Sequence, residues 1–159
     1  FTFFSNGTYN IKVSSSSKEP YFITSGFRPS ANLDDFVFHG VLIKKQDDTL
    51  DMIDDGDLSS QKTFRKAQIL ASVDKYYVSM FYDFNNGLDG ITDIYNDNDP
   101  LIFIEGKNNQ IFNGYIGEKN YKHLNNIDSR LTDIIDYGFI TFFAKPIFTI
   151  LSYLHTYTL

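Results

Sequence analysis

Small or polar residues recur at helical spacing through the last part of the chain, and apolar runs separate them. They occupy positions 138, 141, 145, 149, 152 and 156, and nearly every residue between them is Phe, Ile, Leu or Tyr. This periodicity predicts a helix over residues 138–155 with a thin polar stripe and a broad apolar face. Pro146 removes the hydrogen bond to the carbonyl of Phe142, so we expect either one kinked helix or a new helix that begins at the proline.

Three kinds of helix could carry this pattern. A membrane span needs roughly 20 predominantly apolar residues with few or no charges, and Lys145, Pro146 and the recurring Ser/Thr row argue against it. A core helix of a globular domain and a helix lying in a membrane interface both fit. In the second case Lys145 is placed to reach toward headgroups, and the interface residues are expected to be Phe139, Phe142, Phe143, Lys145, Pro146, Phe148 and Leu151.

The rest of the chain is dominated by strand patterns, in which β-branched and aromatic residues alternate with polar ones. The longest run, residues 68–83, predicts either a strand pair bent at Asp74-Lys75 or one strand with a bulge there, with Leu70 and Met80 buried on either side. Other strands are expected at Phe1–Phe4, Thr8–Val13 (around the turn Ser5-Asn6-Gly7), Tyr21–Thr24, Asp35–Ile43, Leu101–Ile104 and Gln110–Ile116.

Helical spacing takes over after Gly117, where the apolar positions are Tyr121, Leu124, Ile127, Leu131 and Ile134. The chain therefore builds sheet first and helices last. This order predicts a mainly β fold with C-terminal α-helices.

Two acidic stretches, residues 47–57 and 89–99, raise the question of calcium loops. A loop of the EF-hand type needs oxygen ligands at alternate positions, Gly at the sixth and Glu at the twelfth. With Gly56 as the sixth residue, Ile53 is the third and Lys62 the twelfth, so the pattern fails twice. We expect solvated turns at Asp55-Gly56 and Asp89-Gly90 instead.

Composition narrows the classes of function. The 159 residues, 42% of them hydrophobic, suffice for one domain with a real core. The net charge of −6 lies upstream of residue 134, which does not suit a nucleic-acid-binding protein. The chain opens with Phe1 and has no signal segment, so we expect it to be a piece of something longer.

Residues that could carry catalysis are few and scattered. There is no cysteine, and the three histidines, His39, His123 and His155, fall in a predicted strand, a charged helix and the terminal helix, with no spacing that groups them. No phosphate loop, HExxH pair or dinucleotide fingerprint is present. We therefore expect no catalytic residue, no metal site, no cofactor and no enzymatic activity.

Several segments of the sequence form a recognisable set. They are Ile116-Gly117-Glu118-Lys119, Leu131, Asp136-Tyr137-Gly138, Ala144-Lys145-Pro146, Leu151 and His155, and further upstream Asp74-Lys75-Tyr76-Tyr77 and Phe1 to Val13. Together these segments resemble a known family, the periplasmic domain of the YidC membrane protein insertases of Gram-negative bacteria. The family motif residues here are Gly117, Lys119, Asp136, Tyr137, Gly138, Ala144, Lys145 and Pro146.

The resemblance implies an antiparallel β-sandwich, part of a β-supersandwich, on the periplasmic side of the bacterial inner membrane. Residues 1–116 would form the sheets, and residues 117–159 would pack on them and lead to the membrane within one structural domain. The implied function is non-enzymatic assistance to the insertion and folding of inner-membrane proteins. The implied partners are the SecD and SecF components and the SecY complex of the Sec translocase, the lipid surface and nascent membrane proteins. A carbohydrate-binding or carbohydrate-active protein is the alternative, because sugar mutarotases share the supersandwich fold, but fold alone does not carry function.

Overall fold

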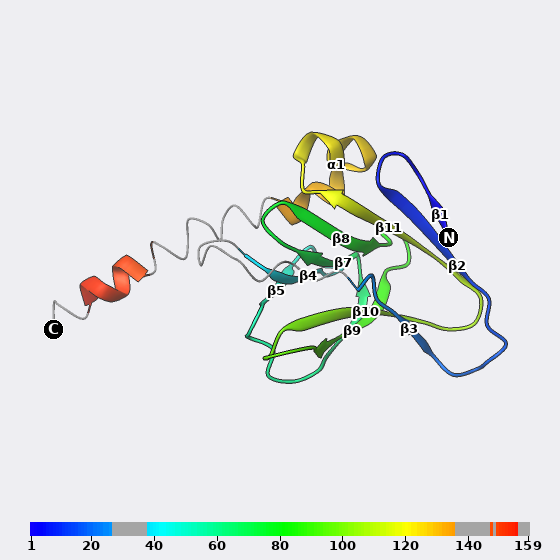
Figure 1. The fold of residues 1–159 in the computed structure, drawn as a ribbon, viewed down its shortest axis with the longest axis horizontal. Coiled ribbons are helices and arrows are strands. Elements are labelled where there is room, and N and C mark those ends of the chain that lie inside the picture. The colour runs from blue at the N-terminus through cyan, green and yellow to red at the C-terminus, as the bar shows by residue number, and fades with distance from the viewer. Residues whose placement is uncertain (27–37, 136–146, 148, 156–159) are drawn as a thin grey trace. The chain divides into compact units, whose positions relative to one another are not determined.

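The computed structural model describes residues 1–26, 38–135, 147 and 149–155. Strands dominate these residues, and helices follow them in the chain (Figure 1). The strands are β1 (Thr2–Phe3), β2 (Thr8–Val13), β3 (Tyr21–Ile23), β4 (Gly40–Lys44), β5 (Leu50–Asp54), β6 (Lys62–Ala67), β7 (Ile69–Val73), β8 (Tyr77–Tyr82), β9 (Leu88–Ile94), β10 (Pro100–Gly106) and β11 (Gln110–Glu118). The helix α1 (Tyr121–Ile127) and the 3-10 helix η1 (Ser129–Thr132) come last.

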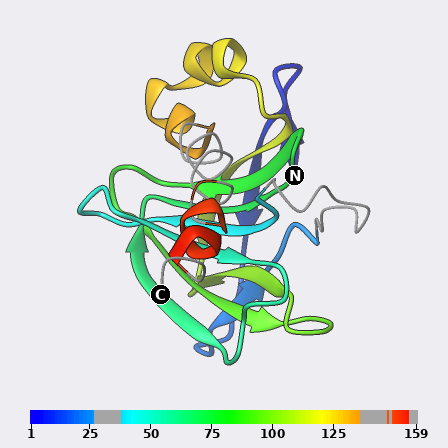
Figure 2. The same ribbon diagram turned by 90° about the vertical axis from the view of Figure 1, so that its left-hand side faces the viewer.

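The strands form two antiparallel sheets. One has seven strands in the order β1-β2-β11-β8-β7-β4-β5, and the other has four in the order β3-β10-β9-β6. Figures 1 and 2 show them as two layers of one compact unit, which ends at Lys119. The predicted mainly β, antiparallel fold with C-terminal helices is thereby confirmed. β10 lies in the four-stranded sheet and β11 in the seven-stranded sheet, so residues 107–109 carry the chain from one sheet to the other.

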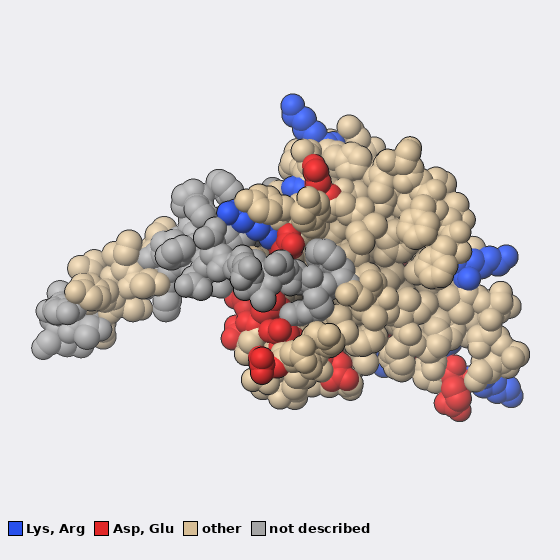
Figure 3. Space-filling view, viewed as in Figure 1, with Lys and Arg blue, Asp and Glu red and all other residues tan. Residues whose placement is uncertain are grey.

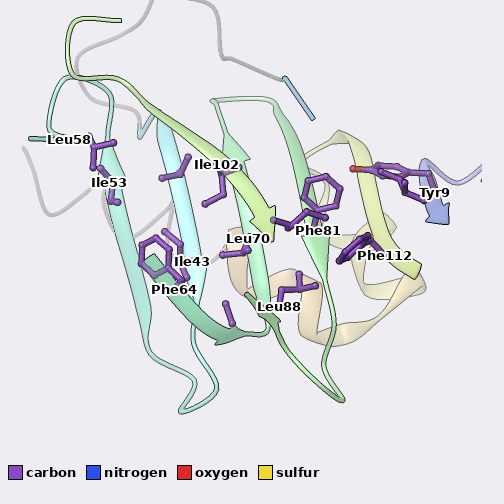
Figure 4. Close-up of a cluster of buried hydrophobic side chains, with 14 residues drawn as sticks. Tyr9, Ile43, Ile53, Leu58, Phe64, Leu70, Phe81, Leu88, Ile102 and Phe112 are labelled. Atoms are coloured by element: carbon purple, nitrogen blue, oxygen red, sulfur yellow. The ribbon is translucent and has the colours of Figure 1, made fainter. Parts of the chain in front are cut away.

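The core lies between the two sheets and draws on both. Tyr9, Phe81 and Phe112 meet at one side of it, where the ring of Tyr9 stands edge-on to that of Phe81 at 6.0 Å (Figure 4). The cluster comprises Tyr9, Ile11, Val41, Ile43, Ile53, Leu58, Phe64, Ala67, Leu70, Phe81, Leu88, Ile102, Ile104 and Phe112. Burial of the larger aliphatic and phenylalanine side chains of this cluster, at roughly 1.5–3 kcal/mol each, is the main force that joins the sheets.

The outer faces of the two sheets differ in polarity. Successive side chains of a strand point to opposite faces, so the residues between the core positions of β7 and β8 face outward. On the seven-stranded sheet these outward residues are apolar and buried, among them Ile69, Val78 and Met80. On the four-stranded sheet the corresponding face is charged, because Arg65 pairs with both Glu105 and Asp89 across three strands.

Two predicted turns are confirmed and one is wrong. Asn6-Gly7 closes the β1–β2 hairpin, with Gly7 at a φ of +83° that favours glycine. Asp55-Gly56 forms a turn after β5. Asp89-Gly90, expected to be a turn, lies inside β9, because Leu70 and the carbonyl of Phe103 pack where a side chain on Gly90 would stand.

The helices belong to a second compact unit, which takes up the chain at Asn120. The Asn120 side chain caps α1 by accepting a hydrogen bond from the amide of His123, and Asp128 caps η1 in the same way through Arg130. Leu124 and Leu131 are buried, at two of the positions that the helical spacing marked as apolar. Helical structure is present again at residues 147 and 149–155.

Candidate functional site

One end of the seven-stranded sheet brings together two segments that carry the family resemblance. β11 pairs with β8 so that Gly117 lies opposite Val78 and Glu118 opposite Tyr77. The turn between β7 and β8, residues 74–76, therefore stands beside residues 117–119, although more than 40 positions separate them in the sequence. We call this region, with the neighbouring turn at residues 4–7, the Lys119 end of the sheet.

Lys119 fastens the two segments together. Its ammonium group donates a hydrogen bond to the backbone carbonyl of Asp74 at 2.7 Å, and its backbone amide donates to the carbonyl of Tyr76 at 2.7 Å. Burial lowers the pKa of Lys119, and the carboxylate of Asp74 works against that shift. The role of this lysine in the folded domain is therefore to hold the β7–β8 turn against the end of β11.

Asp74 shapes that turn from the inside. Its carboxylate Oδ1 accepts hydrogen bonds from the backbone amides of Tyr76 and Tyr77 at 2.7 and 2.6 Å. These bonds satisfy two amides that no strand partner reaches. The prediction of a bend at Asp74-Lys75 between buried Leu70 and Met80 is confirmed, and the bend is a full reversal between two strands.

Gly117 and Tyr115 form a tightly packed pair at the same end. The Tyr115 hydroxyl is buried and donates a hydrogen bond to the carbonyl of Glu118 at 2.9 Å. A Cβ atom on Gly117 would lie 2.6 Å from that hydroxyl oxygen. Glycine is thus required at position 117 because the Tyr115 side chain occupies the space next to it. Burial also raises the pKa of Tyr115.

His39, which directly precedes β4, is a buried histidine. The residue is 7% exposed, and neither ring nitrogen has a hydrogen-bond partner among the described residues. Burial lowers its pKa, while the carboxylates of Asp55, Asp74 and Asp54 act in the opposite direction. A buried imidazole without partners is held in its neutral form, so His39 reports on pH through stability.

The described part of the terminal helix presents an apolar stripe. Ile147, Ile150, Leu151 and Leu154 follow the i, i+3, i+4, i+7 spacing, and each is more than half exposed. Within the described residues no helix has both the length and the apolar character that a membrane crossing requires. The stripe is therefore exposed in the described part of this helix.

The predicted site residues divide into two groups. Gly117 and Lys119 are brought together with Asp74 at the Lys119 end of the sheet, and Leu151 lies on the exposed stripe. The remaining predicted residues lie outside the described part of the chain: Asp136, Tyr137, Gly138, Phe139, Phe142, Phe143, Ala144, Lys145, Pro146 and Phe148.

Within the described ranges, no cluster of side chains is arranged for chemistry beyond binding. No three His, Asp or Glu side chains converge there on a position that a metal ion could occupy. Sequence reasoning missed the burial of His39 and the bond from Lys119 to Asp74. The first had a signal, since His39 stands in an otherwise apolar run, whereas the second had none, because pairing across 45 residues leaves no local trace.

Comparison with known proteins supports the family resemblance. Residues 7–150 match the family model of the YidC periplasmic domain. The chain is 37% identical over 158 residues to a protein of Wolinella succinogenes named membrane protein insertase YidC, and 38% identical over 162 residues to one of that name from Helicobacter pylori. A third, from Campylobacter jejuni, is 34% identical over 156 residues.

These matches take in 98% of this chain and 30% of each relative, so the chain spans about a third of the proteins it resembles. The matched range includes strands β2 to β11, the turn at Asp74 and the Lys119 motif. The chain belongs to the YidC periplasmic domain family.

Proposed function

We propose that this chain is the non-enzymatic periplasmic domain of a membrane protein insertase, on the outer side of the bacterial inner membrane, and that it assists the insertion and folding of inner-membrane proteins. The observation that carries the proposal is the family match over residues 7–150. The relatives, which are named membrane protein insertase YidC, support it. The chain spans 30% of those relatives, and in this proposal the insertion step is carried out by the part of the insertase that the chain does not span. In this proposal the domain orients the insertase and provides contacts to its partners.

Residues 138–155 are proposed to lie in the membrane interface. The exposed stripe of Ile147, Ile150, Leu151 and Leu154 supports this part of the proposal. Since a fully transferred aliphatic side chain gains roughly 1.5–3 kcal/mol, the four exposed halves together would gain about 3–6 kcal/mol in lipid. That is enough for reversible binding, in which Phe139, Phe142, Phe143 and Phe148 would take part and Lys145 would reach the headgroups.

The helical segment is further proposed to pack on the sheets, so that residues 1–116 and 117–159 act as one structural domain. Supporting this is the apolar outer face of the seven-stranded sheet, where Ile69, Val78 and Met80 are buried. A sheet with two apolar faces needs a cover on each. Leu124, Leu131 and Ile134 are buried residues of suitable chemistry on the segment.

The partners that we propose are SecD, SecF and the SecY complex, the lipid surface, and nascent membrane proteins. Among the described residues, the charged outer face of the four-stranded sheet, with its Arg65–Glu105 pair, suits a polar, reversible protein contact. The test is photo-crosslinking in the full-length insertase, in membranes that contain the Sec translocase. A photoreactive residue at Phe22 or Lys107, both on or beside this face, is expected to form adducts with SecD or SecF.

A buried position, Ile102, serves as the control and is expected to form none. Absence of any adduct from the exposed positions, in membranes where the insertase is active, would contradict the Sec contact. Turnover of a sugar anomer by the purified chain, abolished by one carboxylate substitution, would contradict the non-enzymatic assignment.

A further inference from the structure

The Lys119 end of the sheet carries a second apolar and aromatic surface, separate from the terminal helix. Tyr76 is 63% exposed and Tyr77 is 49% exposed at the β7–β8 turn, and Ile116 is 44% exposed on β11. The strand register places Ile116 opposite Ser79 and Glu118 opposite Tyr77, so these side chains belong to adjacent strands. The backbone amide of Ile116 donates a hydrogen bond to the carbonyl of Gly7, so the turn at residues 4–7, which carries the exposed Phe4, adjoins β11.

The charge of this surface is balanced, unlike that of the chain as a whole. Lys75 and Lys119 offset Asp74 and Glu118, whereas the entire chain has a net charge of −6. The carboxylate of Asp74 is engaged with two backbone amides. On the face shown in Figure 3, acidic side chains gather on one part of the sheet unit and leave much of the remainder uncharged. An apolar surface without excess negative charge can approach an anionic bilayer.

The chemistry of the turn suits headgroups better than a protein core. Tyrosine combines an apolar ring with a polar tip, which is why it is enriched where bilayers meet water. The ammonium group of Lys75 lies 5.2 Å from the ring centre of Tyr76, on an exposed turn from which a flexible lysine can reach a phosphate. Aromatic rings and one cation on a protruding, internally bonded turn are the elements of a shallow membrane anchor.

We infer that the Lys119 end of the sheet is a second membrane contact, in which Tyr76, Tyr77 and Ile116 enter the headgroup region of a phospholipid bilayer beside Lys75. The inference rests on the membrane contact proposed above for residues 138–155, and it adds how the sheets are oriented on the bilayer. The chain leaves the sheets at Lys119, so the helical segment begins at the same end that would face the lipid. The sheets would then stand on the bilayer by this end and not by the opposite one.

The chain has no tryptophan, so a single introduced tryptophan reports its own surroundings. We would place one at residue 76 (Tyr76→Trp) and, as a matched control, one at the other end of β11 (Ile111→Trp), where the side chain is 61% exposed. Each variant is mixed with vesicles of phosphatidylethanolamine and phosphatidylglycerol, and sedimentation is measured alongside fluorescence. Tryptophan at 76 is expected to emit at shorter wavelength and to be quenched by brominated acyl chains, while tryptophan at 111 stays in water.

Lys75→Ala is expected to weaken vesicle binding by about fivefold, the contribution of one lysine near an anionic surface. If the protein sediments with vesicles but tryptophan 76 keeps its emission in water, this inference is wrong and the helix contact stands. If the protein does not sediment at all, both fail. Equal shifts at 76 and 111, or a shift that grows with protein concentration and needs no vesicles, would also overturn the inference, the latter by indicating a second copy of the chain as the partner.

Discussion

The packing of Gly117 against Tyr115 offers a test of the motif at single-atom precision. A Cβ on Gly117 would stand 2.6 Å from the Tyr115 hydroxyl oxygen and 3.0 Å from Cζ. Tyr115 is 1% exposed and its hydroxyl is bonded to Glu118, so the ring cannot swing away freely. Gly117→Ala therefore forces an overpacked contact, and Tyr115→Phe removes the atom that makes it.

The magnitudes follow from the two parts of each change. Overpacking costs about 1–3 kcal/mol, and loss of glycine entropy in the unfolded chain returns about 0.4–1 kcal/mol, so Gly117→Ala should lose up to about 2.6 kcal/mol. Tyr115→Phe loses one hydrogen bond, about 0.5–1.5 kcal/mol. In the double variant the hydroxyl is absent, so we expect it to be about 1 kcal/mol more stable than the sum of the single changes predicts.

Urea unfolding of the purified chain measures all four free energies. The control cycle pairs Tyr115→Phe with Gly90→Ala, a crowded glycine whose neighbours are Leu70 and Phe103 and not Tyr115. That pair should be additive to within about 0.5 kcal/mol. Additivity in the Gly117 cycle as well would refute the argument that the tyrosine hydroxyl selects glycine at this position.

Two further predictions concern His39 and Leu124. The folded-state pKa of His39 lies below its unfolded value. Below about pH 6.5 the unfolded chain therefore binds a proton at His39 that the folded chain does not bind. As the pH falls toward the folded pKa, the free energy of unfolding decreases by at most about 1.4 kcal/mol per pH unit. Urea unfolding at pH 7.5 and 5 should show His39→Phe losing less stability than the parent, and equal losses would contradict this. Leu124→Ala should destabilise the fold by about 2–5 kcal/mol and speed amide hydrogen exchange at Met80. The exposed control Asn125→Ala should do neither. Faster exchange confined to the helix would contradict packing of the helical segment on the sheets.

Local signals in the sequence were sufficient for the hairpins. Asn6-Gly7 supplied the positive φ that the β1–β2 turn needs, and Asp74 supplied a carboxylate for the amides of its own turn. The same kind of signal misled at Asp89-Gly90, where glycine is present because Leu70 packs against it inside β9. A dipeptide does not distinguish a glycine needed for its dihedral angles from one needed for space.

Strands β5 and β6 escaped the sequence pattern for different reasons. β5 lies within the acidic stretch, and its Asp51 is neutralised by Lys45 at 2.9 Å, which only the folded hairpin reveals. β6 carries a bulge between Phe64 and Ala67, which breaks the alternation of buried and exposed positions. Both strands are specified by their neighbours more than by their own residues.

The motif residues were recognisable before their geometry was. Gly117, Lys119 and the segment from Asp74 to Tyr77 stood out by resemblance, but their convergence depends on the register of β8 against β11. The same holds for His39, which is buried and directly precedes β4, a strand paired with β5 and β7. Periodicity locates elements, whereas a site made by pairing distant elements requires the fold.

The proposed membrane contact is tested most directly by sedimentation of the intact chain with vesicles of phosphatidylethanolamine and phosphatidylglycerol. The apolar stripe is removed by Ile150→Asp with Leu154→Asp, and the control places the same charges at the polar positions Thr149 and Ser152. We predict that the intact chain and the control sediment with the vesicles and that the stripe variant remains largely in the supernatant. Equal sedimentation of all three proteins would show that the terminal helix is not the contact and would contradict the account.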